Sequence, residues 1–384
     1  MVLFLHNRYR TTGGEERAVE ELVWLVREQL GEQAELLTRS SSELSPRRAA
    51  LGLLRGGLEP EQVTRAVRES GARVVHAHNL QPSLGWRALA AARAAGARTI
   101  LHLHQYRLVC AIGTCYTRGA ECTRCHGRNT LAGVRLNCRD SAPEALAYGA
   151  SLALWQRRMV EQADAIVVPS VFARERLRAL GASLPWERVH VLAPPLRALL
   201  DAPPPRAAEP SPATYALVVS RLAPEKGVDV AIDACRSAGL SLVVAGDGPQ
   251  RAELEARAAS GHGLAGASVR FVGRVDDAEL ARLRADASIA LVPSRSAETF
   301  GLAAAEAMAA GLPVAASRIG ALAELLEDDV LVPAGDVPAM AQAITRLAGD
   351  RDAGARGRER VSSLCAPAVV GAQLAGVYAG DAPH

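Results

Sequence analysis

The sequence has little net charge and no long apolar run. Its 384 residues include 44 basic and 41 acidic ones, a formal net charge of +3, so it lacks the clustered basic face of a nucleic-acid-binding protein. No stretch reaches the ~18 consecutive apolar residues of a transmembrane helix, and the opening Met1–Asn7 turns polar too soon for a secretion signal. We therefore expect a cytoplasmic protein without a nucleic-acid partner or a transmembrane segment; peripheral association with a membrane stays open.

A disulfide framework is also not expected. The chain has 7 cysteines, an odd number, and it carries no recognisable secretion signal. Five of them lie between Cys110 and Cys138, in a long loop that we predict over residues 106–140. Clustering of this kind indicates a local role for the thiols.

The spacing of these cysteines predicts a structural zinc site. Two of them form a Cys-x-x-Cys pair and two more lie on either side of it, in a loop that has no core of its own. The predicted ligands are Cys110, Cys122, Cys125 and Cys138. Cys115 and His126 are alternative ligands, and buried thiols or a redox pair are alternative interpretations.

Short apolar runs alternate with helical patterns along the whole chain. Such runs are typical of parallel strands that are covered on both faces. In the first half the predicted strands are Val2–His6, Ala34–Leu37, Val74–His78, Thr99–His104, Ala165–Pro169 and Val189–Leu192. In the second half they are Tyr215–Ser220, Ser241–Ala245, Val269–Val272, Ser288–Val292, Pro313–Ala316 and Val330–Val332. The predicted class is α/β, with two Rossmann-like, doubly wound parallel-sheet domains.

A proline-rich segment divides the two halves. Five prolines within the twelve residues 201–212 exclude a helix or a central strand and predict a semi-rigid linker over 201–213. The predicted domains are residues 1–200 and 214–364. Residues 365–384 are predicted to form a C-terminal helix that packs back on the first domain. Ligands of such sheets bind outside the carboxyl ends of the strands, so we expect a cleft between two facing domains.

One further helix is predicted within the first domain. Residues 143–158 read as an amphipathic helix whose apolar face could contact an acceptor or a membrane surface. Core packing or a second subunit would explain that face equally well.

Two cations follow the first predicted strand of the second half. Arg221 and Lys226 come directly after that strand, and Gly227 allows a tight backbone approach. An arginine can grip two oxygens and a lysine supplies a point charge, so the pair suits a diphosphate. An exposed surface loop is the alternative interpretation.

Two glutamates eight residues apart frame a predicted helix that runs from about Gly301 to Gly311. Backbone N–H groups from Thr299 through Phe300 and Gly301 to Leu302 can receive a phosphate there. Glu298 lies in the loop before the helix. Glu306 lies inside an alanine-rich helix, where a lone carboxylate is costly unless it is paired or ligand-bound.

The first half carries a glycine pair and a histidine at two predicted strand ends. Gly13 and Gly14 precede a helix that we predict to open at Ala18, and the pattern lacks the Gly-x-Gly-x-x-Gly of a dinucleotide site. His104 ends a predicted strand and is followed by Gln105. A core histidine bonded to backbone is the alternative interpretation of His104.

Taken in order, these motifs resemble glycosyltransferase family 4 (group 1 type), whose members are retaining enzymes with the GT-B fold. Glu298 and Glu306 resemble its Glu-x7-Glu motif, and Arg221 and Lys226 fall where the family has its diphosphate-binding pair. The turns that contain Gly248 and Gly273 resemble its Gly-x-Gly-Pro turn and its base-holding loop. The family usually has Asp where this chain has Gln105, which leaves the role of position 105 open.

The resemblance implies transfer of a hexosyl or N-acetylhexosaminyl group from a nucleoside-diphosphate sugar to an acceptor hydroxyl. It implies no catalytic metal. A UDP-sugar is the favoured donor and a GDP-sugar is the alternative, because no residue decides the base. The implied catalytic residues are His104, Glu298, Arg221 and Lys226. Glu306 is implied to bind the ribose, and Gly13 and Gly14 to cover the donor phosphates.

Several features stay open at this level. The acceptor could be a small molecule, a natural product, a lipid-linked sugar or a polysaccharide, and the chain could be a monomer or a homodimer. Two alternative functions are a sugar-nucleotide epimerase of the same fold and a non-catalytic partner that binds a nucleotide sugar.

Overall fold

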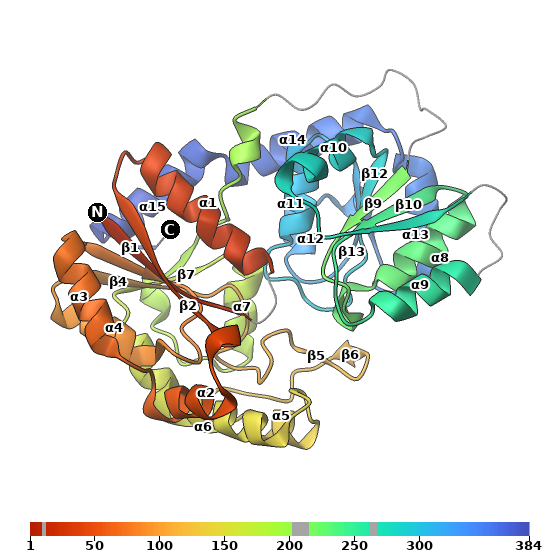
Figure 1. Cartoon of the computed structure of the whole chain (residues 1–384). Coiled ribbons are helices and arrows are strands. Elements are labelled where there is room, and N and C mark those ends of the chain that lie inside the picture. Colours follow the sequence, from red (N-terminus) through yellow and green to blue (C-terminus); the bar gives the residue numbers. More distant parts are fainter. Residues whose placement is uncertain (10–12, 202–214, 261–266, 384) are drawn as a thin grey trace. The chain divides into compact units, whose positions relative to one another are not determined.

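The computed structural model describes residues 1–9, 13–201, 215–260 and 267–383, and the chain forms two compact units (Figure 1). The first unit comprises residues 1–117, 122–195 and 367–384, and the second comprises residues 118–121 and 196–366. The predicted linker 201–213 lies, from residue 202 onward, outside the described residues.

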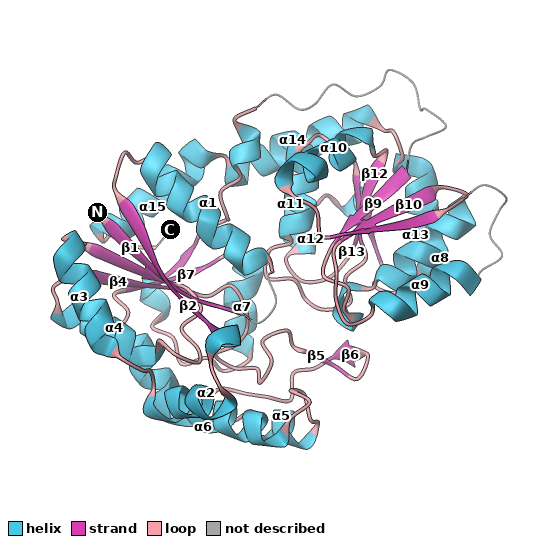
Figure 2. Cartoon of the chain, viewed as in Figure 1, coloured by secondary structure: helices cyan, strands magenta, loops and turns pink. Residues whose placement is uncertain are grey.

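Each unit is built around a six-stranded sheet whose neighbouring strands are all parallel (Figure 2). The first sheet has the order β2 (Ala34–Ser40), β1 (Val2–Arg8), β3 (Val74–Ala77), β4 (Arg98–His102), β7 (Ala165–Val168), β8 (Val189–Val191). The second has the order β11 (Val269–Gly273), β10 (Ser241–Ala245), β9 (Tyr215–Val219), β12 (Ile289–Val292), β13 (Val314–Ser317), β14 (Leu331–Val332). All twelve predicted strands are present, and the predicted α/β class with two doubly wound sheets is confirmed.

Alternate residues of the strands in the first unit supply two separate cores. Val2 and Phe4 lie in a core with residues of α1 (Gly14–Glu28) and α15 (Pro367–Ala379). Leu3 and Leu5 point to the opposite face. The helices that share that second core are α3 (Pro60–Ser70), α4 (Gly85–Ala94), α6 (Ala142–Glu161) and α7 (Val171–Ala179).

The C-terminal helix α15 belongs to the first unit. Its residues Val370, Leu374 and Val377 are buried in the core that contains Phe4, and Arg98 Nε donates a hydrogen bond to the Val377 carbonyl oxygen at 3.2 Å. The stretch from α14 (Arg351–Cys365) through α15 is the one candidate membrane span found in the described chain, by length and composition. Burial of its apolar side chains in the core of the unit accounts for the apolar character of α15.

The order of the strands places a switch point in each sheet. In the second unit the chain moves from β9 to β10 on one side and later to β12 on the other. In the first unit the same reversal falls between β1 and β3. Crevices at such points, outside the carboxyl ends of the strands, are where doubly wound sheets bind ligands.

The remaining elements cover the sheets or connect their strands. In the second unit they are α8 (Val228–Ala238), α9 (Arg251–Ser260), α10 (Asp277–Asp286), α11 (Leu302–Ala309), α12 (Leu322–Leu325) and α13 (Val337–Leu347). In the long loop after β4 they are β5 (Tyr116–Thr117), β6 (Ala120–Glu121) and α5 (Leu131–Arg135), and earlier in the chain α2 (Pro46–Arg55). The sequence did not predict the short hairpin of β5 and β6.

Among the predicted boundaries that differ from the structure, three bear on the candidate site. Helix α1 begins at Gly14 rather than Ala18, so that Glu15 and Glu16 lie in its first turn, where carboxylates suit the helix dipole. Helix α11 ends at Ala309, two residues before Gly311. Strand β4 ends at His102, which puts His104 in the loop beyond it.

Candidate functional site

In the second unit the loops after β9 and β12 are joined by a lysine–glutamate pair. Lys226 Nζ lies 2.6 Å from Glu298 Oε1, and Ser294 Oγ donates to the same oxygen at 2.6 Å. The two strands are neighbours, so this pair lies at the switch point of the sheet. The sequence predicted Lys226 and Glu298 at this place but missed their mutual contact and the role of Ser294.

Lys226 is the only lysine in the sequence, whereas lysine and arginine together number 44. The other predicted cation, Arg221, forms an ion pair with Glu225, whose side chain is buried. Each predicted cation therefore forms an ion pair with a carboxylate.

The two loops also share backbone contacts that fix their spacing. The Arg295 N–H donates to the Glu225 carbonyl oxygen at 2.8 Å, and the Arg295 guanidinium grips Asp229 through two bonds of 2.7 and 2.6 Å. Gly227 has φ of 63°, and a Cβ there would overlap the carbonyl oxygen of Pro293. Only glycine accepts both the conformation and the close approach.

The backbone of Glu298 is held from the other side by the loop after β13. The Ala321 N–H donates to the Glu298 carbonyl oxygen at 2.9 Å, and a Cβ on Gly320 would overlap the Glu298 backbone nitrogen. Burial acts to raise the pKa of Glu298, but Lys226 and the bond from Ser294 outweigh it, so the pKa lies below its ordinary value. Glu298 is therefore an ionised carboxylate at neutral pH.

The N-terminus of α11 lies directly after Glu298. Gly301 caps the helix with φ of 95° and ψ of 50°, and its carbonyl oxygen accepts the first helical bond, from the Ala305 N–H, at 3.0 Å. The N–H groups of the first turn begin at Leu302, so the predicted set starting at Thr299 lies mostly before the helix. Phe300 is buried.

Glu306 lies one turn inside α11 and has a partner that the sequence did not reveal. It forms a buried ion pair with Arg284 of α10. Arg284 therefore offsets the free-energy cost that the sequence predicted for a lone carboxylate on this helix. A role of Glu306 in ribose binding stays a prediction.

The two other predicted glycines lie at neighbouring strand ends. A Cβ on Gly248 would overlap the backbone of Leu222, one residue after Arg221, and the Leu222 N–H donates to the Asp247 carbonyl oxygen at 3.0 Å. The Gly273 carbonyl oxygen accepts from the Gly246 N–H at 2.7 Å. These turns therefore support the loop that carries Arg221.

In the first unit the start of α1 is tied to the end of β1 by acidic side chains. Glu16 accepts hydrogen bonds from the Gly13 and Tyr9 N–H groups at 2.8 and 3.2 Å, and Glu15 accepts from the Tyr9 hydroxyl at 2.6 Å. Gly13 and Gly14 are exposed at this helix start. Residues 10–12 between them and Tyr9 lie outside the described residues.

Gln105 connects these acidic residues to the loop after β4. Its amide nitrogen donates to Glu15 Oε2 at 3.3 Å, and its oxygen accepts from Arg107 Nε at 3.1 Å. The Arg107 guanidinium lies 4.4 Å above the centre of the Tyr9 ring. An aspartate at position 105 would repel Glu15, which gives a physical reason for glutamine in this chain.

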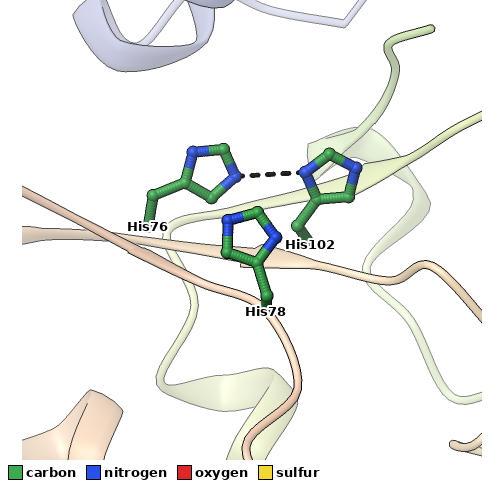
Figure 3. A group of neighbouring side chains, drawn as sticks. All are labelled: His76, His78 and His102. Atoms are coloured by element: carbon green, nitrogen blue, oxygen red, sulfur yellow. Dashed lines mark hydrogen bonds between the residues drawn. The ribbon is translucent and has the colours of Figure 1, made fainter. Parts of the chain in front are cut away.

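Four histidines at the ends of β3 and β4 stack against one another, and Figure 3 shows three of them, His76, His78 and His102. His76 and His102 lie side by side, with Nε2 and Nδ1 3.2 Å apart, and His76 Nδ1 bonds the Tyr378 hydroxyl of α15 at 2.8 Å. His78 stacks on both rings, and His104 stacks on His102 with centroids 4.1 Å apart. Burial lowers the pKa of His76 to about 3 and also lowers those of His78, His102 and His104, so the stack is neutral at pH 7.

Three of these histidines form the one potential metal-ligand group found among the described residues. His76, His78 and His102 each offer a ligand atom, within 4.8 Å of the others. Their rings, however, are nearly parallel, with interplanar angles of 14° to 28°. Ligand lone pairs lie in the ring planes, so parallel rings do not aim at a common ion, and we interpret the group as a neutral hydrogen-bonded stack.

The predicted zinc ligands, unlike the three histidines, are not found as a metal-ligand group among the described residues. The Cys110 thiol is hydrogen-bonded to Cys115 and to backbone N–H groups of the same loop. These hydrogen bonds lower its pKa to about 6. Cys138 Sγ donates to Thr117 Oγ1 at 3.6 Å. Among the described residues Cys110, Cys122, Cys125 and Cys138 do not form a metal-ligand group, and zinc binding stays a prediction.

Both units match protein-family models, and solved structures share the whole fold. Residues 8–195 match a model described as "Glycosyl transferase 4-like domain", and residues 213–350 match "Glycosyl transferases group 1". Sucrose-phosphate synthase from Thermosynechococcus elongatus has a TM-score of 0.70 at 18% identity, with 98% of each chain covered. Anabaena HepE, solved with UDP and glucose, has a TM-score of 0.63 at 17% identity, covering 98% of this chain and 99% of its own. The chain therefore has the GT-B fold.

Curated relatives carry glycosyltransferase names. Phosphatidyl-myo-inositol mannosyltransferase of Mycobacterium leprae is 37% identical over 132 residues, covering 32% of this chain and 34% of the relative. Alpha-D-kanosaminyltransferase of Streptomyces kanamyceticus is 30% identical over 263 residues, covering 59% and 63%. The matched segments thus span less than two thirds of either relative. Both units therefore resemble glycosyltransferase domains, each through its own family model.

Proposed function

We propose that the protein is a retaining glycosyltransferase that moves a hexosyl group from a nucleoside-diphosphate sugar to an acceptor hydroxyl. The observation that carries this proposal is the Lys226–Glu298 pair, 2.6 Å apart at the switch point of the second sheet and next to the start of α11. A cation, a carboxylate and a helix N-terminus in one place match the needs of a sugar diphosphate.

The proposed chemistry is stabilisation of a leaving diphosphate. Arg221 and Lys226 leave their carboxylates for the diphosphate, and the N–H groups that begin at Leu302 add further donors. These preorganised donors meet the charge that develops as the glycosidic bond breaks. Once released from Lys226, Glu298 orients the sugar hydroxyls, while Ser294 keeps it in place.

Retention of the anomeric configuration is part of the proposal. We propose that the acceptor attacks on the face that the diphosphate leaves and that a phosphate oxygen takes the acceptor's proton. In this proposal Glu298 stays a binding group, because it accepts hydrogen bonds from the hydroxyls of the transferred sugar while Ser294 holds it in place. His104 contacts the donor sugar, and Glu306 binds the ribose.

We propose UDP as the nucleotide and a lipid-linked or small polar acceptor. HepE, which shares the fold, was solved with UDP. A competing candidate is GDP, because a GDP-mannose-dependent dimannoside mannosyltransferase of Mycobacterium tuberculosis is 43% identical over 115 residues, 28% of this chain. Acceptors that contain a lipid or a sugar are suggested by the names of the relatives, and acceptors of the first kind would bring the protein to a membrane surface.

The proposal can be tested with a panel of UDP- and GDP-hexoses and pooled sugar and lipid acceptors. Release of the nucleoside diphosphate should depend on an acceptor and should fall about 100-fold or more in Glu298→Gln, and proton NMR of the product should report a retained anomeric configuration. A new sugar nucleotide formed without an acceptor would indicate an epimerase. Binding without any turnover across the panel would indicate a non-catalytic partner.

A further inference from the structure

His104 is hydrogen-bonded to His78 within the histidine stack. His78 Nδ1 and His104 Nε2 are 2.8 Å apart, and the two rings stack with centroids 5.1 Å apart. His78 follows β3 and His104 follows β4, which are neighbouring strands of the first sheet. The loop that carries His104 is thus held against the adjacent strand end by this bond.

The surroundings of His78 decide which of the two nitrogens carries the proton in this bond. Its second nitrogen, Nε2, is buried and has no hydrogen-bond partner among the residues that the structure describes. A proton on Nε2 would leave a buried N–H donor without an acceptor, which is the rarer and costlier kind of orphan. A proton on Nδ1 of His78 is donated in the 2.8 Å bond to His104. Only the lone pair of His78 Nε2 is then left without a partner among the described residues.

The direction of the bond then fixes the tautomer of His104. A neutral imidazole has one N–H and one bare nitrogen. Because His78 Nδ1–H donates to His104 Nε2, the proton of His104 is on Nδ1. Burial keeps both rings neutral at pH 7, so this assignment holds over the physiological range.

We propose that His78 is a positioning residue that locks His104 in the Nδ1–H form. Nε2 of His104 then accepts the bond from His78, and no bare nitrogen of His104 is left to act as a general base. This inference rests on the proposed function only for the identity of the reaction. Stacking on His102, 4.1 Å away, keeps the ring plane of His104 fixed.

The first test reads the tautomer directly and does not depend on activity. In histidine labelled with nitrogen-15, NMR should find His104 with a protonated Nδ1 and a bare Nε2, identified by loss of its signals in His104→Gln. In His78→Phe the preference should disappear or reverse. A protonated Nε2 on His104 in the wild-type protein would overturn the proposal.

The second test uses the geometry of amide side chains. The amide of asparagine falls near the position of Nδ1 of a histidine, whereas the amide of glutamine falls near Nε2. We therefore expect transfer activity to stay near wild type in His78→Asn and to fall about 10-fold in kcat/KM in His78→Gln and His78→Phe. Equal losses in all three folded variants would contradict the positioning role.

A matched control separates this role from general packing. His76 lies on the same face two residues earlier and is equally buried, but its bonds go to His102 and Tyr378. His76→Phe should lower thermal stability and leave the tautomer of His104 unchanged. Affinity for UDP or GDP, measured in all variants, should also be unchanged; if the wild type binds neither, the proposed function fails while the tautomer test still stands.

Discussion

Replacing Lys226 with methionine is the sharpest test of the predicted diphosphate site. Lys226 and Glu298 are 27% and 18% exposed, and Nζ is 2.6 Å from Oε1. Methionine keeps most of the side-chain volume and removes the charge. A hydrogen bond to a charged group contributes about 1.5–3 kcal/mol, but the diphosphate must first displace Glu298. We therefore expect a loss near the lower end, about 10-fold in affinity for the nucleoside diphosphate.

The assay is isothermal titration calorimetry with UDP and GDP, supported by thermal unfolding to verify that each variant is folded. Lys226→Arg keeps the charge and should bind within a few-fold of wild type. Arg282→Ala removes an exposed arginine of α10 that forms ion pairs with Glu279 and Asp286 of its own helix, and this variant should bind like wild type. A folded Lys226→Met protein that binds as tightly as wild type would refute the assignment of this lysine.

Three other perturbations have defined outcomes. The lowered pKa of Glu298 stabilises the fold above the unfolded pKa near 4.5, and this contribution is lost as pH falls through the folded value; the difference in thermal stability between wild type and Glu298→Gln should therefore shrink below about pH 4, and a difference independent of pH would contradict the ionised state. Gly320→Ala should weaken nucleotide binding and lower the melting temperature, because a Cβ there overlaps the Glu298 backbone; unchanged values in both assays would argue against that clamp. The neutral histidine stack should make the first unit lose stability as pH falls from 6.5 toward the folded pKa of about 3 for His76, since the unfolded chain then takes up protons that the folded stack does not; urea unfolding that is insensitive to pH in this range would count against a neutral stack.

Strand positions were predictable because each strand is a short apolar run bounded by polar or glycine residues. The exposed ends were less predictable: β1 extends to Arg8 and β2 to Ser40, where residues with polar side chains still pair through their backbones. The hairpin of β5 and β6 has two residues in each strand, too few for a periodic pattern to register.

Candidate site residues could be predicted from their place at strand ends, but their partners could not. Lys226, Glu298 and His104 follow strands, and the sequence indicates as much. The ion pair of Glu306 with Arg284 joins two helices through side chains whose facing positions depend on packing. The scarcity of lysine was a signal that could have singled out Lys226.

The histidine stack illustrates a second limit. Alternation along β4 predicts that His102 and His104 share a face, and the same reasoning applies to His76 and His78. Their assembly into one group depends on the register between β3 and β4, which pairs His76 with Ile100. Register of this kind is a tertiary property, set here by burial on both faces of the sheet.

Binding of the diphosphate of a nucleotide sugar by the second unit is the step on which the proposed function depends. The most direct measurement is a calorimetric titration of the full chain with UDP, GDP and ADP, in wild type and in Arg221→Ala. We predict that one nucleotide binds wild type and that its affinity falls at least about 10-fold in the variant. Failure of all three to bind the folded wild-type protein, or equal binding by the variant, would contradict the claim.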